Sequence, residues 1–143
     1  MTFQTVHNAI RNRFSANVID TSSAIDANDV CWDNTAFSKH DNADTVRWVR
    51  FQVLPANSEI RELGQTTART EGIALASVFM VAGQGDKLGL ALADEIVAAF
   101  KAITHTHSGT TVSFRTPSVL PIGRTDGPWW QINVSIPFYT DDA

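Results

Sequence analysis

Apolar residues recur at helical spacing along residues 86–103. Five large ones share a single helix face: Leu88, Leu92, Ile96, Phe100 and Ile103. Alanines widen this face with small side chains that favour helix and allow close packing. Asp86 is a candidate N-cap, because its carboxylate can accept hydrogen bonds from the free amides of the first turn. An isolated helix of this length is marginally stable in water, so we expect it to pack on a sheet.

A second, shorter helix is predicted for residues 2–14. Its apolar face consists of Phe3, Val6, Ile10 and Phe14. Residues 15–45 follow and are dominated by polar and acidic side chains, which predicts a long surface connection. We expect this connection to be anchored at the edge of the core by Val30, Trp32 and Phe37.

Strict alternation of apolar and polar residues predicts a strand at residues 46–54. Val49, Phe51 and Val53 occupy one face, and the other face carries Trp48, Arg50 and Gln52. Residues 71–82 form a continuous apolar run that fits either a buried strand or a buried helix. We predict a central strand, because glycines bracket the run and β-branched and aromatic residues fill it.

The clearest strand pattern lies at residues 130–138. Five residues are expected to point inward: Trp130, Ile132, Val134, Ile136 and Phe138. A further strand is predicted at residues 111–119, with Val112 and Phe114 on one face and Pro117 at an edge or at the strand's end. Residues 104–109 are predicted to be a turn and residues 121–128 a loop.

Residues 55–70 lie between two predicted strands but are polar. Charged residues surround Gly64 in this segment, namely Glu59, Arg61, Glu62 and Arg69. A long hairpin that projects beyond the sheet fits this composition. Because such an arm has no packed face of its own, we expect it to be either mobile in a monomer or ordered by a neighbouring molecule.

The length and the pattern together predict one α+β domain over residues 1–143. We expect a four- to five-stranded, mostly antiparallel sheet with two main helices packed on it and a projecting hairpin.

The net charge of −4 and the lack of a Lys/Arg cluster argue against a general nucleic-acid or anionic-membrane surface. No apolar run reaches the roughly 18 residues of a spanning helix, and we expect no signal peptide. The single Cys31 fits folding in a reducing cytoplasm.

Two sequence features suggest ligand chemistry but fit it poorly. Gly83 and Gly85 stand where a dinucleotide fingerprint would, but Leu88 replaces its third glycine and Asp86 would repel a phosphate. His105 and His107 are spaced to point the same way from a strand, yet two ligands do not make a metal site.

Catalytic patterns are also missing from the sequence. No Gly-x-Ser-x-Gly elbow is present, and Cys31 lacks a catalytic local signature. Asp94 and Glu95 are helix neighbours that diverge by about 100°, so they are not a paired acid and base. We therefore predict no catalytic residue, no cofactor and no metal.

The pair Trp129 and Trp130 is more informative. Successive strand side chains face opposite ways, so at most one of the two can join the core. The outward Trp129, beside an outward Trp48, would form an apolar patch typical of association surfaces. The alternative is that a loop or the N-terminal helix covers this patch.

The order of these features resembles the tail terminator, or tail-completion, family of long-tailed bacteriophages. The resemblance rests on Trp32-x-Asn34-x-x-Phe37, the strand at residues 49–55, the hairpin around Gly64, Gly72-Ile-Ala, the helix led by Gly85, and residues 117–138. It covers nearly the whole chain and lies in the ordered pattern rather than in any one motif.

The resemblance implies a small α+β domain and a structural rather than an enzymatic role. Family members form a hexameric ring on top of the tail tube, end its polymerisation and present a face to the head connector. The implied partners are sister subunits, the tail tube protein and a head connector or stopper protein. DNA would only pass through the pore, and no membrane is involved. The implied location is the tail or neck of the virion, after assembly in the host cytoplasm.

We expect contacts with subunits or partners at eight residues: Trp48, Arg50, Glu59, Arg61, Glu62, Arg69, Glu71 and Trp129. Five of them, Glu59, Arg61, Glu62, Arg69 and Glu71, alternate in charge along the arm, which suits a head-to-tail contact within a ring. One alternative is another neck or head–tail adaptor, or a tail-tube subunit. A different class, a small ligand-binding or enzymatic α+β domain, would require convergent polar groups in a concave pocket.

Overall fold

The structure is a computed structural model of the 143-residue chain. It describes residues 3–19, 25, 27–33, 37, 47–60, 68–83, 87–125 and 127–142, and for residues 55–60, 68 and 142 it describes the backbone alone.

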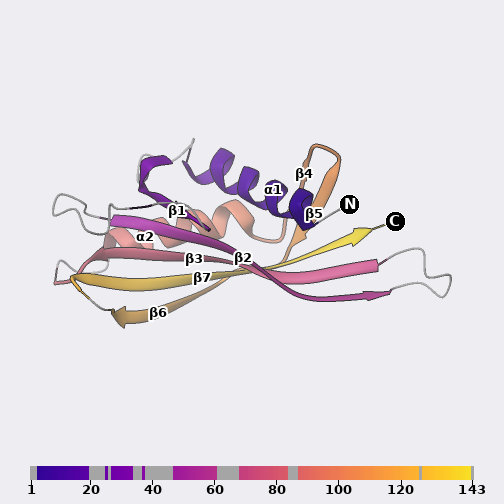
Figure 1. Ribbon diagram of the computed structural model, residues 1–143. Helices are drawn as coiled ribbons and strands as arrows, with labels where there is room; N and C mark the ends of the chain where they lie inside the picture. The colour runs from indigo at the N-terminus through magenta and orange to yellow at the C-terminus, as the bar shows by residue number, and fades with distance from the viewer. Residues whose placement is uncertain are drawn as a thin grey trace.

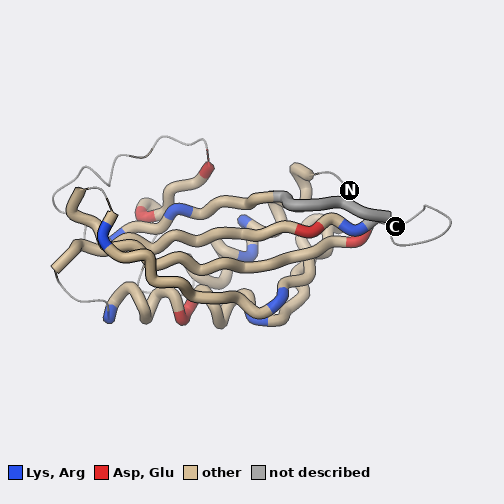
Figure 2. Tube along the Cα trace, turned by 90° about the horizontal axis from the view of Figure 1, so that it is seen from below, with Lys and Arg blue, Asp and Glu red and all other residues tan. Residues whose placement is uncertain are grey.

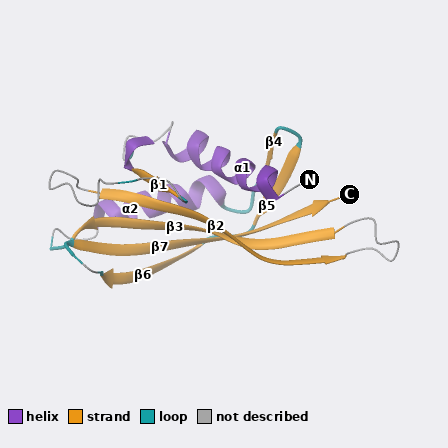
Figure 3. Ribbon diagram, in the orientation of Figure 1, coloured by secondary structure: helices purple, strands orange, loops and turns teal. Residues whose placement is uncertain are grey.

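Two helices pack on one face of a twisted sheet, which gives the two layers seen in Figures 1 and 3. Helix α1 (Phe3–Phe14) continues into a π-helical turn, Ser15–Ile19, and helix α2 (Lys87–Phe100) follows the third strand. The predicted α+β architecture with two main helices is therefore confirmed. The opposite face of the sheet, which we call the outer face, carries no helix in the described part of the chain.

The described residues form seven strands rather than the expected four to five. Their bounds are β1 (Val30–Trp32), β2 (Arg47–Ile60), β3 (Ala68–Val81), β4 (Thr104–His107), β5 (Thr110–Phe114), β6 (Ser118–Arg124) and β7 (Trp129–Asp142). The order is β1-β2-β3-β7-β5-β4, and β6 also pairs with β7. Only β1 joins in parallel, to β2; every other pairing is antiparallel.

The three additional strands lie in segments that were predicted as connections, and those predictions were wrong. Strand β1 lies within the expected surface connection, and β4 replaces the expected turn at residues 104–109. The true turn is at Ser108 and Gly109, both with positive φ. Strand β6 includes Pro121 and much of the expected loop at 121–128. Because β6 lies at an edge, a missing N–H there is tolerated.

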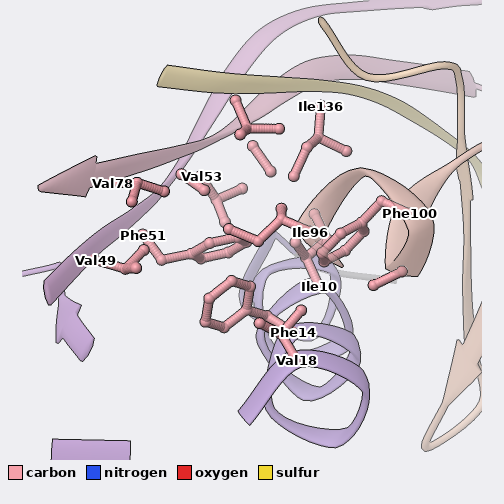
Figure 4. Close-up of a cluster of buried hydrophobic side chains, with 14 of the residues drawn as sticks. Ile10, Phe14, Val18, Val49, Phe51, Val53, Val78, Ile96, Phe100 and Ile136 are labelled. Atoms are coloured by element: carbon pink, nitrogen blue, oxygen red, sulfur yellow. The ribbon is translucent and has the colours of Figure 1, made fainter. Parts of the chain in front are cut away.

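The alternating residues of β2, β3 and β7 meet the two helices in one core (Figure 4). Fully buried members include Val49, Phe51, Val78, Ile132, Val134 and Ile136 from the strands, and Ile10, Phe14, Leu92, Ile96 and Phe100 from the helices. The predicted inward faces of residues 46–54 and of the stretch from Ile132 to Phe138 are thereby confirmed.

Each helix exposes the large residue in its first turn. Leu88 is 59% exposed and Phe3 is 49% exposed, although both were expected in the apolar stripes. In α2, Gly89 takes the buried position instead and lies against Met80, where a Cβ would overlap the methionine side chain. The helix therefore approaches the sheet through a glycine, which leaves Leu88 outside.

Strands β2 and β3 extend well beyond the helices as the predicted projecting arm (Figure 1). Their pairing continues to Ile60 opposite Ala68, and β7 accompanies β3 as far as Asp142. The tip of the hairpin, with Arg61 and Glu62, lies outside the described residues, as does the side chain of Glu59.

Gly72 lies where the arm leaves the body of the sheet. A Cβ there would be 2.6 Å from the carbonyl oxygen of Leu54 and 2.7 Å from Cζ of Phe138. The register of β2 shifts nearby, between Pro55 and Asn57. The neighbouring strand and the Phe138 ring thus come closer at this point than any residue with a side chain would permit.

Replacing the buried Phe14 tests the core. Phe14→Ala is expected to lower the free energy of unfolding by about 3–5 kcal/mol, since the removed ring leaves a cavity. Phe3→Ala, in the same helix, is the matched control and should cost about 0.5 kcal/mol or less. Urea denaturation measures both changes. Equal losses in the two variants would contradict this packing.

Replacing Gly72 tests the close approach at the base of the arm. Gly72→Ala is expected to lower the free energy of unfolding by about 1–3 kcal/mol, because the obstructing Leu54 carbonyl is backbone and cannot turn aside. Gly89→Ala should cost less, because it meets only side-chain atoms of Met80, which can change rotamer, and gains helix propensity. Thermal and urea unfolding of both variants give the comparison, and a larger loss in Gly89→Ala would refute it.

Candidate interaction surfaces

The outer face of the sheet holds most of the residues that were expected to make contacts. In the pairing of β2 with β3, Trp48 is opposite Phe79 and Arg50 is opposite Ser77. These side chains point away from the helix-facing row of Val49, Phe51 and Val53, as alternation requires.

Trp48 and Trp129 do not form the expected exposed patch. Trp48 is 7% exposed, Trp129 is 6% exposed, and both pack with Phe79 in a second, smaller cluster. The rings of Trp48 and Phe79 stack at 4.0 Å, and Trp129 meets Trp48 edge-on at 6.1 Å. Phe37, from the connection after β1, packs on Trp48 at 5.2 Å. The alternative that a loop covers this patch is therefore the correct one.

The two neighbouring tryptophans face opposite ways, as alternation predicts. Trp129 belongs to the outer cluster, whereas Trp130 was expected to point inward to the core. Trp130 instead stays 36% exposed, beside Met80 and near the end of the sheet. Trp130 lies in the strand on the predicted face, but the buried core ends before it and leaves it partly exposed.

Charged side chains gather on the outer face at the base of the arm, where Figure 2 shows red and blue segments close together. The guanidinium of Arg69 donates two hydrogen bonds to the carboxylate of Asp141, at 2.7 and 2.9 Å. Arg115 donates to Glu71 at 3.3 Å. The ring of Tyr139 lies near both cations, 4.2 Å from Cζ of Arg69 and 5.0 Å from Cζ of Arg115.

This group, which we call the arm-base ladder, joins β3, β7 and the segment after β5. The hydrogen bond to Asp141 raises the pKa of Arg69 above its usual value. Exposed ion pairs add little stability, because water screens them. Arg69 and Glu71, which were expected to contact other subunits, are thus already paired within the chain.

Arg50 is half-buried on the outer face, and its Cζ lies 5.5 Å from the centre of the Phe79 ring. Its Nε has no hydrogen-bond partner within the described part of the chain. The hydroxyl of Ser77, directly across from it, is also buried and without such a partner.

Exposed apolar residues mark a surface that the sequence analysis missed. Strand β6 exposes Val119 (37%), Leu120 (60%) and Ile122 (47%). Leu54 and Ile73, paired across β2 and β3, are 47% and 39% exposed on the outer face. The apolar run at residues 119–122 was the available signal, but it was divided between a predicted strand ending at 119 and a predicted loop beginning at 121.

Comparisons with known proteins identify the family. A family model described as "Phage tail terminator protein" matches residues 5–138. The chain belongs to the phage tail terminator family. It is thus related to structural proteins of the phage tail, as the resemblance had implied.

A solved structure supports the fold of this family member. It is 22% identical in sequence, covers 98% of this chain and 96% of its own, and superposes with a TM-score of 0.74. At this identity the likeness speaks for the fold alone. A comparison with curated proteins finds no match.

One histidine of this tail terminator family member, His105, joins β4 to α1. Nε2 of His105, on β4, donates to Oδ1 of Asn12 on α1 at 2.9 Å. Burial, helped by the charge of Arg13 and by His107, lowers the pKa of His105. Across the described residues, no three His, Cys, Asp or Glu side chains come together as a metal site. None of the described helices is long and apolar enough to cross a membrane.

The packing of His105 predicts a pH dependence. Its pKa is lower when folded than the roughly 6.5 of an unfolded chain, so the unfolded state binds more protons as the pH falls. The stability contribution of neutral His105 is therefore complete above about pH 6.5 and is lost as the pH drops through the folded pKa.

His105→Gln keeps a donor for Asn12 but cannot titrate. Between pH 8 and pH 5, roughly the range in which histidine titrates, the wild type should lose more free energy of unfolding than this variant. Urea denaturation across this range measures the difference. His7, whose pKa is also lowered by burial, is present in both proteins and cancels. Parallel pH profiles would rule out the assigned role.

Proposed function

We propose that this chain caps the phage tail tube as a ring, ends tube polymerisation and joins the tail to the head connector. The observation that carries the proposal is the tail terminator family match over residues 5–138. Because the match spans both helices and most of the sheet, it concerns the fold as a whole rather than one motif.

The shape of the molecule supports an assembling role. Strands β2 and β3 pair far beyond the helices, and none of the arm side chains that the structure describes, Arg69 to Glu71, belongs to the core. A feature of this kind gains little stability in a monomer, whereas a neighbouring subunit can bury it. The arm-base ladder lies on the outer face at the arm, Arg50 lies on the same face beside Phe79, and we propose that both help to position the chain against a sister subunit.

Two of the expected contact residues are not part of this proposal. Trp48 and Trp129 are buried, and Phe37 packs on Trp48, so neither tryptophan offers much surface to a partner. Participation of Glu59, Arg61 and Glu62 remains a prediction.

The proposed partners are the tail tube protein on one side of the ring and the head connector or stopper protein on the other. DNA would pass through the pore without being held, in keeping with the net charge of −4. Assembly would take place in the host cytoplasm, and the protein would remain in the tail or neck of the virion. Its position in the particle distinguishes this role from that of another neck adaptor or of a tube subunit.

Deleting the gene from a phage that carries it tests the proposal. Electron microscopy should show overlong or unattached tails, because tube growth would lack a terminator and the head would lack its joint. Supplying the wild-type chain from a plasmid should restore tails of uniform length joined to heads. Particles of normal appearance without the chain would contradict the proposal. A complete absence of tails would instead indicate a tube subunit.

A further inference from the structure

Besides the edge formed by β4, two stretches of free strand edge lie on opposite sides of the described sheet. Strand β1 pairs with β2 only at residues 49–51. Beyond that point, the outer edge of β2 at residues 52–60 has no partner strand in the described part of the chain. On the other side, β6 pairs with β7 and is itself the edge. Unpaired strand edges are ready-made templates for another chain.

The two free edges run in opposite directions. Strand β6 is antiparallel to β7, β7 is antiparallel to β3, and β3 is antiparallel to β2. A second copy set edgewise beside the first, in the same orientation, therefore places its β2 antiparallel to β6. Leu120 is level with Arg50 through Asn133 and Ser77, and β1 already pairs with that stretch of β2, so the second copy must also be shifted by four residues along the strands to bring Leu54 beside Leu120. The contact would extend the ladder in the pattern that the sheet already uses.

Side chains on the two edges also match. Leu120 lies opposite Asn133, and Asn133 lies opposite Ser77, so Leu120 belongs to the outer face. Leu54, opposite Ile73, belongs to the same face. When two edges pair, residues on one face become neighbours, and an apolar pair favours the contact. Leu120 is 60% exposed and Leu54 is 47% exposed, so each has apolar surface left to bury.

Strand β6 lacks one usual protection of an edge, a charged residue along most of its length, although it has a proline and a register shift. Its residues from Ser118 to Gly123 carry no charge, whereas natural edge strands are commonly guarded by lysines or other charged residues. Pro121 and the register shift between Pro121 and Gly123 are its only interruptions. These features limit the length of ladder that a partner can form, and so favour a selected partner over indiscriminate pairing.

We propose that β6 of one copy pairs antiparallel with the free edge of β2, beyond Phe51, of the next copy, with Leu120 beside Leu54. The two surfaces differ, so the contact is head-to-tail, and a head-to-tail contact closes into a ring when its rotation permits. This inference rests on the proposed ring-forming function and names the surfaces that build the ring.

Cysteine cross-linking in assembled particles tests the contact. Three variants are made with Cys31 replaced by serine: Leu54→Cys, Leu120→Cys and the double variant. A short thiol-to-thiol cross-linker spans direct and diagonal neighbours on paired strands, about 5–8 Å apart, so the exact register need not be known. The double variant should give a ladder of products that ends at the closed ring. A mixture of the two single variants should stop at dimers, since each such pair has one reactive contact.

Leu88→Cys combined with Leu54→Cys is the matched control. Leu88 is 59% exposed, nearly the same as Leu120, but it lies on α2 and outside the proposed contact. This control should yield no ladder. No ladder from the double variant in particles with normal tails would overturn the proposed contact and leave the terminator function standing. Dimers from Leu120→Cys alone would overturn it in favour of a symmetric contact.

If the double cysteine variant folds but does not assemble, a pair of opposite charges at residues 54 and 120 tests the contact instead. Leu120→Asp or Leu54→Lys alone should reduce the yield of terminated tails by about tenfold or more, because an unpaired charge would be buried. The two changes in one chain should restore most of that yield, since each contact would then hold an Asp beside a Lys. Loss without restoration, in chains that remain folded, would refute the contact. The gene deletion described above tests the terminator function separately.

Discussion

The contact among Phe14, Phe51 and Phe100 holds the molecule together. Phe14 and Phe51 lie 4.5 Å apart between ring centres, and Phe100 lies 6.5 Å from Phe14 and 6.3 Å from Phe51. Each ring comes from a different element, so this one contact fixes α1, α2 and β2 relative to one another. Arg13 strengthens the joint by donating to the carbonyl oxygen of Ala99 at 2.8 Å. Both helices are thereby held on the same face of the sheet, and neither covers the outer face.

The kind of side chain on the outer face changes along the strands, from aromatic at one end to charged at the other. At one end Trp48, Phe79 and Trp129 form a closed cluster, and at the other end the arm-base ladder links β3, β7 and the segment after β5. Between them lie small polar groups and exposed leucines. The outer face is therefore only partly covered by other parts of the chain, which suits a protein whose family works in an assembly. The body of the fold is stabilised by its own core, and the arm gains most from a neighbour.

Sequence reasoning predicted what depends on local periodicity. Alternation identified the two faces of β2 and of β7, and helical spacing identified α1 and α2, because burial of one face leaves a repeating pattern. Strands β1, β4 and β6 left no such pattern. They are three to seven residues long, and their pairing depends on backbone hydrogen bonds to partners distant in sequence rather than on their own side chains.

The contact surfaces were harder to predict than the fold, because they depend on register. Trp48 is buried since β3 places Phe79 directly opposite, and no property of residue 48 alone reveals that partner. Glu71 is paired because the segment after β5 brings Arg115 across 44 residues. The long arm was predicted correctly from the polar composition of a segment between two strands. Its free edge was not, because an edge is defined only once every neighbour is placed.

The place of β7 in the sheet has a consequence for biosynthesis. The strand follows every other described strand in sequence, yet it lies at the centre, bonded to β3, β5 and β6. A nascent chain cannot complete its sheet until residues up to Asp142 have left the ribosome, so the central pairing forms only after this region has been translated. Until then the edge of β3 that β7 later covers is open, and chaperones that shield such edges are expected to matter most at this stage.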